Sequence, residues 1–304
     1  MKKSILFTGI LIACLCSAAV TVSAKDGKEK KDVKEYLPEA GDFAISVSAN
    51  PFINFIGNMF NNSTTNGMNS FGGGVYSVDN NQAILPTVSV SGKYMFTDEL
   101  GLRVNLGWIH NSKTDNVYVN DDADLAVNPL SQKQLIDSYK HSESGGSFSA
   151  AMEYRVGKRR VQGVFSAGLL YAFSYQSQKF SYGNAITEIN QTPSCNLSGY
   201  QAPALNGFSS TRYLKKFTDS PTNYAGLLLS AGIEWFVAPK ISIGGEVNIS
   251  AVWNWTKATY YTAEGFNTLS GAVEEWTELE KPSSHGFSFG TGNIGSNLSV
   301  TFYF

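Results

Sequence analysis

The stretch LGLRVNLGW, Leu100–Trp108, alternates apolar and small or polar residues without a break. Successive side chains of a β-strand point to opposite faces, so one face would be apolar and the other would carry the glycines, Arg103 and Asn105. Seven further segments repeat the pattern, near residues 42–49, 87–96, 147–155, 161–173, 227–235, 241–253 and 297–304. The alternation is least regular in the segment 161–173, because Val164 and Leu170 fall on its polar face. The sequence therefore predicts eight strands.

The connections between these strands are expected to alternate in length. Short turns are expected at 97–99, 156–160 and 237–240. Long polar loops are expected near 58–82, 112–144, 176–222 and 256–285. If such a chain closes on itself, the strand near 42–49 pairs with the last strand in antiparallel fashion.

Periodicity alone does not say which face forms the core, because a soluble sandwich and a membrane barrel share it. Here the polar face is mainly Ser, Gly, Asn and Thr, and only 16% of the chain is charged. A solvated sheet of this size would carry more Lys and Glu. Aromatic residues end the apolar faces, as interfacial girdles do; these are Tyr94, Phe96, Trp108, Tyr154, Tyr171, Trp235 and Trp253. We therefore predict an all-β, eight-stranded antiparallel transmembrane β-barrel over 41–304, with short periplasmic turns and long extracellular loops.

The N-terminus predicts export. Lys2 and Lys3 precede an apolar run, and Val22-Ser23-Ala24 forms a small-residue cleavage site, so residues 1–24 read as a cleaved signal peptide. A lipoprotein site at Cys14 is the alternative. Residues 25–40 alternate charges and are expected to be flexible. After cleavage Cys195 is the single cysteine, so no internal disulfide is expected.

The closing octet NLSVTFYF, Asn297–Phe304, resembles the end of small barrels of the outer-membrane protein A type. The segment Pro38–Phe60 resembles the opening of outer-membrane barrels from Bacteroidota. This resemblance implies an assembly signal, read by the barrel-assembly machinery, made of Leu298, Val300, Phe302 and Phe304. It also implies a Gram-negative outer membrane, with lipid, lipopolysaccharide and periplasmic chaperones as partners.

Six charges fall on the face that would line the barrel. An eight-stranded barrel is just wide enough to be filled by side chains, and charges inside it must pair or stay hydrated. We expect a structural plug of ion pairs, with a gate that passes small ions at low conductance as the alternative. The six residues are Lys93, Arg103, Glu153, Arg155, Glu234 and Glu246.

The remaining motifs of the sequence predict no catalytic or metal-binding site. Residues 50–60 are expected to form a rim helix, with a plug as the alternative. The acidic run Asn120–Leu130 is expected to be a solvated loop rather than a calcium site. We predict a non-enzymatic structural protein with no metal, cofactor or nucleic-acid partner. The alternatives are a surface binding module using Gln176–Asn223 and a hydrolase using His141 with Ser142 and Glu143.

Overall fold

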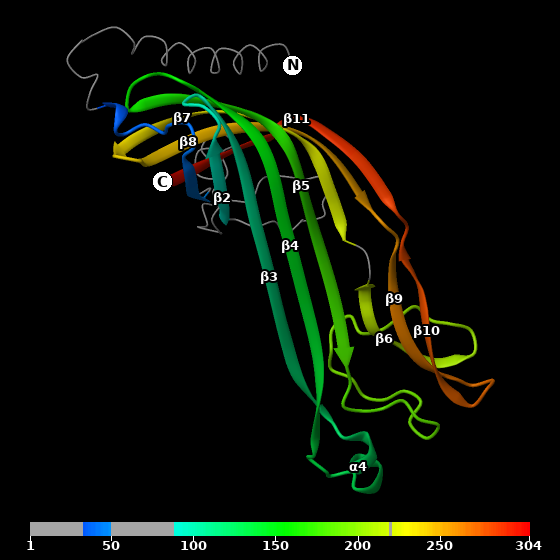
Figure 1. The fold of residues 1–304 in the computed structure, drawn as a ribbon. Coiled ribbons are helices and arrows are strands. Elements are labelled where there is room, and N and C mark those ends of the chain that lie inside the picture. Colours follow the sequence, from blue (N-terminus) through cyan, green and yellow to red (C-terminus); the bar gives the residue numbers. More distant parts are fainter. Residues whose placement is uncertain (1–32, 50–87, 219–220) are drawn as a thin grey trace.

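The computed structural model describes residues 33–49, 88–218 and 221–304. These residues form one antiparallel sheet of eleven strands and one short helix (Figure 1). The elements are β1 (Phe43–Ala49), β2 (Val88–Met95), β3 (Leu100–Asn120), α4 (Asp122–Val127), β4 (Gln134–Val156), β5 (Val161–Ser181), β6 (Phe208–Thr218), β7 (Thr222–Ala238), β8 (Ile241–Thr256), β9 (Thr259–Asn267), β10 (Ala272–Lys281) and β11 (Ser284–Tyr303). The expected helix at 50–60 and the expected loop at 58–82 lie outside the described residues.

Eight strands pair in a closed ring, which we call the ring. Its order is β1-β2-β3-β4-β5-β7-β8-β11 and back to β1, with every neighbouring pair antiparallel. The seam joins the two ends of the chain, since Ala44 lies opposite Tyr303 and Val47 opposite Val300. These are the eight segments that alternation predicts, and the expected pairing of first and last strands is confirmed.

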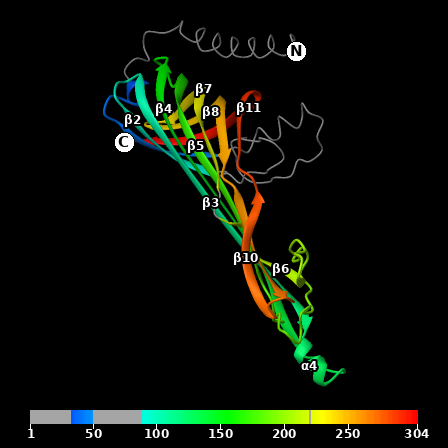
Figure 2. The ribbon, with the colours of Figure 1, turned by 90° about the vertical axis from the view of Figure 1, so that its right-hand side faces the viewer.

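Three further strands were not predicted. β3, β4 and β5 run on beyond the ring, and β6, β9 and β10 continue the sheet beside β5 (Figure 1). We call the outer parts of β3, β4 and β5, together with β6, β9 and β10, the distal sheet. The expected loops at 112–144, 176–222 and 256–285 are therefore wrong over much of their length. β3 and β4 stay paired as far as Asn120 opposite Gln134. Figure 2 shows this sheet projecting from one end of the ring.

The short connections lie together at the other end of the ring. They span 96–99, 157–160 and 239–240, close to the predicted positions. Gly157 and Lys240 have positive φ angles of 121° and 58° there. Glycine adopts that region without steric cost, whereas Lys240 carries a side chain that makes it less favourable.

The two faces of the ring strands differ sharply in exposure. On β11, Thr301 is fully buried and Tyr303 nearly so, whereas Phe302 and, just after the strand, Phe304 are exposed, Phe304 to 72%. The four residues of the expected assembly signal all lie on this exposed face. So do the expected interfacial aromatics, with Trp108 72% exposed and Tyr94 half-buried. The ring thus buries its polar face and exposes its apolar face.

Candidate functional site: the charged interior of the ring

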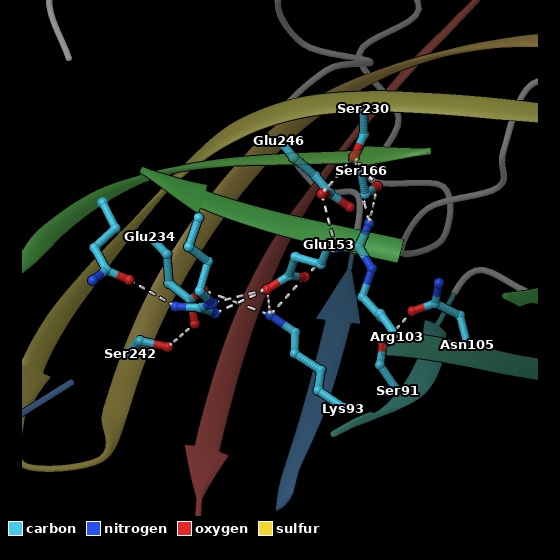
Figure 3. A network of polar contacts seen from close by, with 12 residues as sticks. Ser91, Lys93, Arg103, Asn105, Glu153, Ser166, Ser230, Glu234, Ser242 and Glu246 are labelled. Atoms are coloured by element: carbon cyan, nitrogen blue, oxygen red, sulfur yellow. Dashed lines mark hydrogen bonds and ion pairs between the residues drawn. The ribbon is translucent and has the colours of Figure 1, made fainter. Parts of the chain in front are cut away.

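The six predicted interior charges come together inside the ring. They come from five strands: Lys93 on β2, Arg103 on β3, Glu153 and Arg155 on β4, Glu234 on β7, and Glu246 on β8. Figure 3 shows the cluster from close by, with Lys93 and Arg103 reaching toward Glu153. Alternation places each side chain inward, and ring closure brings distant parts of the chain within contact distance.

Glu153 lies at the centre of the cluster and is 1% exposed. Its carboxylate lies 3.3 Å from Lys93 Nζ, 3.7 Å from Arg103 Nη1 and 3.0 Å from Arg155 Nη2. Three cations thus surround one buried anion. Because an unpaired charge at this depth would be strongly unfavourable, the three contacts explain how Glu153 is tolerated.

Glu234 lies on the side of the cluster nearest the short connections. It pairs with Arg155, and its carboxylate lies 3.6 Å from Lys93 Nζ. The hydroxyl of Tyr303 donates a 2.9 Å hydrogen bond to Glu234 Oε1, and Ser242 donates to the same oxygen. Arg155 also donates to Tyr303 and, at 2.9 Å, to Gln162 Oε1.

Glu246 lies on the opposite side of the cluster. Its carboxylate lies 2.8 Å from Arg103 Nη1 and accepts hydrogen bonds from Asn297 Nδ2 at 2.8 Å and Ser230 Oγ at 3.1 Å. Arg103 Nη2 donates to Ser166 Oγ at 3.0 Å. The three acidic and three basic side chains therefore form one continuous and electrically neutral network.

The neutral members of this network were missed as site residues. Alternation places all of them inward, but they carry no formal charge that would distinguish them from the other polar residues of that face. Their hydroxyl and amide groups satisfy the acids and guanidinium groups where no counter-charge is available. They are Gln162, Ser166, Ser230, Ser242, Asn297 and Tyr303.

Two apolar clusters lie on either side of the charges along the strands. Toward the short connections, Met95, Phe236, Ala44 and Tyr303 pack together, and Tyr36 and Leu37 cover them. Toward the distal sheet, Tyr224 packs with three further buried side chains, Leu170, Ala172 and Val252. The inward positions of Val164 and Leu170, which looked irregular in the sequence, are thus confirmed as buried. The charged network is enclosed at both ends.

The segment before β1 closes the end with the short connections. The Arg160 guanidinium stacks 3.7 Å from the Tyr36 ring centroid, and the Lys240 amide donates to Tyr36 O at 3.3 Å. Lys240 Nζ pairs with Asp42 at 2.5 Å. Residues 33–40 belong to the segment expected to be flexible, and here they pack against the ring; residues 25–32 lie outside the described residues.

The acidic run after β3 contains the short helix α4 rather than only a loop, and most of its residues are exposed as predicted. Asp121 caps α4 by accepting from the amides of Ala123 and Asp124, and its ion pair with Lys133 lowers the pKa of Asp121. Asp122 accepts from Ser194 N at 2.7 Å. These carboxylates are therefore occupied by the chain itself. Within the described part of the chain, no group of three or more His, Cys, Asp or Glu side chains is arranged to hold a metal ion.

The suggested hydrolase residues do not converge. His141 Nε2 lies 2.7 Å from Glu143, but Ser142 is the intervening residue of β4 and points to the opposite face. Ser142 contacts Ser112 instead. Elsewhere His110 Nδ1 lies 2.8 Å from Ser144, and no carboxylate contact orients His110 among the described residues. His285 is exposed near the start of β11.

Cys195 lies in the irregular segment between β5 and β6 and is partly buried. Burial raises the pKa of its thiol to about 11. Because the thiolate is the reactive form, this thiol is a poor nucleophile at neutral pH.

The fold and its interior define a class: an all-β antiparallel sheet with a closed ring of eight strands around a buried ion-pair network. No helix among the described residues is long and apolar enough to cross a membrane. No protein-family model matches the chain, and no curated protein matches it.

Comparison with solved structures finds outer-membrane β-barrel proteins. The outer membrane protein OprG of Pseudomonas aeruginosa is 12% identical, with 88% of this chain and 98% of that chain covered and a TM-score of 0.30. A major outer membrane protein of Thermus thermophilus is 12% identical, with 87% and 100% covered and a TM-score of 0.32. Ail, the attachment invasion locus protein of Yersinia pestis, is 10% identical, with 87% and 98% covered and a TM-score of 0.30. These values assign no family to the chain.

Proposed function

We propose that this protein is an integral β-barrel of a bacterial outer membrane with a structural, non-enzymatic role. Its ring crosses the lipid, and the ion-pair network fills the interior. The end with the short connections faces the periplasm, and the distal sheet faces the exterior. No cofactor takes part in this function.

The observation that carries the proposal is the inversion of the two faces of the ring. Leu106, Leu169 and Leu229 are exposed on its outer face, while Glu153 and Arg155 are buried on its inner face. Water would favour the reverse, since exposed apolar patches of this extent mark contact with a partner or with lipid. A lipid-facing apolar band with aromatic ends and a polar interior is the pattern of transmembrane barrels.

Closure of the ring fits the same environment. An open sheet edge in hydrocarbon leaves peptide groups without hydrogen-bond partners, so only a closed ring of strands is stable there. The seam between β1 and β11 runs from Ala44 opposite Tyr303 to Ala49 opposite Leu298. Phe304 extends the seam, because its amide donates to Phe43 O at 2.7 Å.

The packed interior favours a sealed barrel over an open pore. A permeating ion would have to separate the contacts of Glu153 and pass two apolar clusters. Each separated pair would leave a buried charge uncompensated, which is strongly unfavourable. We therefore expect no stable large channel, and any conductance to be low.

The proposal also names partners. Outer-membrane lipid and lipopolysaccharide would surround the ring, and periplasmic chaperones and the barrel-assembly machinery would act during biogenesis. The exposed apolar row that ends at Phe304 supports an assembly signal read by that machinery.

Heat-modifiable gel migration tests the barrel directly. The folded protein should migrate differently before and after boiling and should fractionate with outer membranes. Identical migration together with a soluble fraction would contradict the proposal. Planar-bilayer recordings should show no large channels, and stable large channels in the unmodified protein would contradict the sealed interior.

Phe304→Ala tests the assembly signal. This variant keeps the backbone hydrogen bonds to Phe43 but removes the terminal aromatic ring. We expect the yield of heat-modifiable protein in the outer membrane to fall severalfold, while Phe304→Tyr keeps most of it. Normal insertion of Phe304→Ala would argue against the signal.

A further inference from the structure

One face of the distal sheet carries a straight row of lysines. Lys140 on β4 lies directly opposite Lys179 on β5, and Lys179 lies directly opposite Lys215 on β6. Directly opposed residues of antiparallel strands point to the same side of the sheet. All three side chains are exposed. With strands about 4.8 Å apart, the Cα atoms of the three lysines lie along roughly 10 Å.

The row is unfavourable for the folded chain by itself. Like charges placed directly opposite each other on neighbouring strands repel and destabilise a sheet. Elsewhere the chain provides counter-charges, as at Lys133 with Asp121 and Lys216 with Glu280. Among the described residues, Lys140, Lys179 and Lys215 have no ion-pair or hydrogen-bond partner. No Asp or Glu of β3, β4, β5 or β6 shares this face with them in the described distal sheet. On β9, Glu264 lies on this face two residues from Thr262, and it is paired with Arg212 at 2.8 Å.

Hydroxyl groups flank the row on both sides. Ser142 lies opposite Ser177 in the next row on the same face, and Ser138 lies opposite Ser181 in the row on the other side. The ends of the lysine row are also hydroxylated, because Thr114 lies opposite Lys140 and Thr262 lies opposite Lys215. The face therefore presents three cations flanked by hydroxyl groups, of which Ser138 donates to Asn116 Oδ1 at 2.8 Å and Ser142 contacts Ser112 at 3.0 Å.

We propose that this face binds clustered phosphate groups through Lys140, Lys179 and Lys215. Lysine ammonium groups bind phosphate as compact point charges, and serine hydroxyls donate to phosphate oxygens. A phosphate monoester carries about −1.5 to −2 charge at neutral pH, so two or more phosphates neutralise the row better than a single carboxylate does. Binding removes the repulsion that the row creates. The binding face lies on the projecting sheet shown in Figures 1 and 2, beyond the ring, and goes beyond the structural role proposed above.

Calorimetric titration of the full chain in neutral detergent with sodium tripolyphosphate tests the site. We expect Lys179→Gln to weaken binding about tenfold or more, because it removes the central charge. Lys140→Gln and Lys215→Gln should weaken binding less, and Lys179→Arg should keep it. Lys158→Gln is the matched control, since it removes one exposed lysine at the opposite end of the molecule. We expect raised salt to weaken binding to the unmodified protein.

A second arm identifies the source of the phosphate. Nanodiscs that contain lipopolysaccharide are compared with nanodiscs in which its phosphates have been removed. Binding that needs those phosphates indicates a membrane-borne ligand, and binding of tripolyphosphate alone indicates a soluble polyphosphate. Either outcome supports the proposal if Lys179→Gln reduces the binding that is observed. Heat-modifiable migration is read on the same samples, so a failure of the barrel proposal is seen separately.

Three outcomes would overturn the proposal. The first is that the unmodified protein binds neither probe, and the second is that Lys158→Gln weakens binding as much as Lys179→Gln does. The third is that a sulfated polymer binds at the row while phosphate does not. Misfolding is excluded by thermal unfolding, because the three glutamine variants relieve repulsion and should unfold at the same or a higher temperature.

Discussion

The ring and the distal sheet share β3, β4 and β5 but follow opposite rules of burial. Within the ring, Arg103 and Glu153 are buried and Leu106 is exposed. Along β3 beyond the ring, residues 110–118 are exposed on both faces. In the distal sheet, the buried side chains of Tyr261 and Ala263 form an ordinary apolar core with Ala202. The shared strands therefore pass from a ring with a buried charged interior to a distal sheet whose apolar core is built mainly on β9.

The two regions also differ in how they hold their charges. Arg155 is 1% exposed and contacts two carboxylates in the ring, whereas Lys113 of the distal sheet, with a 77% exposed side chain, contacts Asp115 at 2.8 Å. Buried pairs become strongly destabilising when one partner is removed, while exposed pairs contribute little.

The largest effect is expected in the ring at Arg155→Ala. This change leaves Glu153 and Glu234 buried with fewer cations, and we expect the free energy of unfolding to fall by about 3–5 kcal/mol. Urea unfolding in detergent, followed by tryptophan fluorescence, measures it. A loss below about 1 kcal/mol would mean that water reaches the interior and that the network is not enclosed.

A roughly hundredfold effect is expected at Cys195, in the irregular segment beside the distal sheet. Its pKa of about 11 is roughly two units above the value for an ordinary thiol, so the thiolate fraction near pH 8 is about a hundredfold smaller. Alkylation by iodoacetamide should be slow in the folded protein and become fast after unfolding in urea. Equal rates in both states would show that this segment does not shield the thiol.

A moderate, local effect is expected at Arg212→Lys in the distal sheet. Arg212 pairs with Glu264 at 2.8 Å, donates to Asn184 O at 2.8 Å and stacks 4.0 Å from the Tyr182 ring centroid. Lysine cannot make these three contacts together, and we expect a loss of about 1–2 kcal/mol. Limited proteolysis should cut the distal sheet sooner, while the ring keeps its heat-modifiable migration. If the ring unfolds at the same time, the two regions are one cooperative unit.

The smallest effect is expected at Lys113→Ala. The pair with Asp115 is exposed, so the free energy of unfolding should change by about 0.5 kcal/mol or less. The same urea experiment as for Arg155→Ala makes the two results directly comparable. A loss as large as that of the ring variant would contradict the contrast between enclosed and solvated charges.

The ring strands were predictable from the sequence, whereas the strands of the distal sheet were not. Alternation found the eight ring strands because one face of each is apolar and the other polar, as at Leu100–Trp108. It missed the outer half of β3, NSKTDNVYVN, because both faces there are mostly polar and leave no apolar period. The strands β6, β9 and β10 were missed for a related reason, since their apolar residues are few and interrupted by bulges.

The sequence by itself determined which side chains of the ring strands share a face, because that depends only on the two-residue period of a strand. It thereby determined that six charges and Tyr303 point inward. Tertiary structure alone decided which of them meet, since Lys93, Glu153 and Glu234 lie on three strands whose separation is set by ring closure and register. It also decided that Lys140, Lys179 and Lys215 form one row, because only the pairing of β4, β5 and β6 brings residues so far apart in the chain into line.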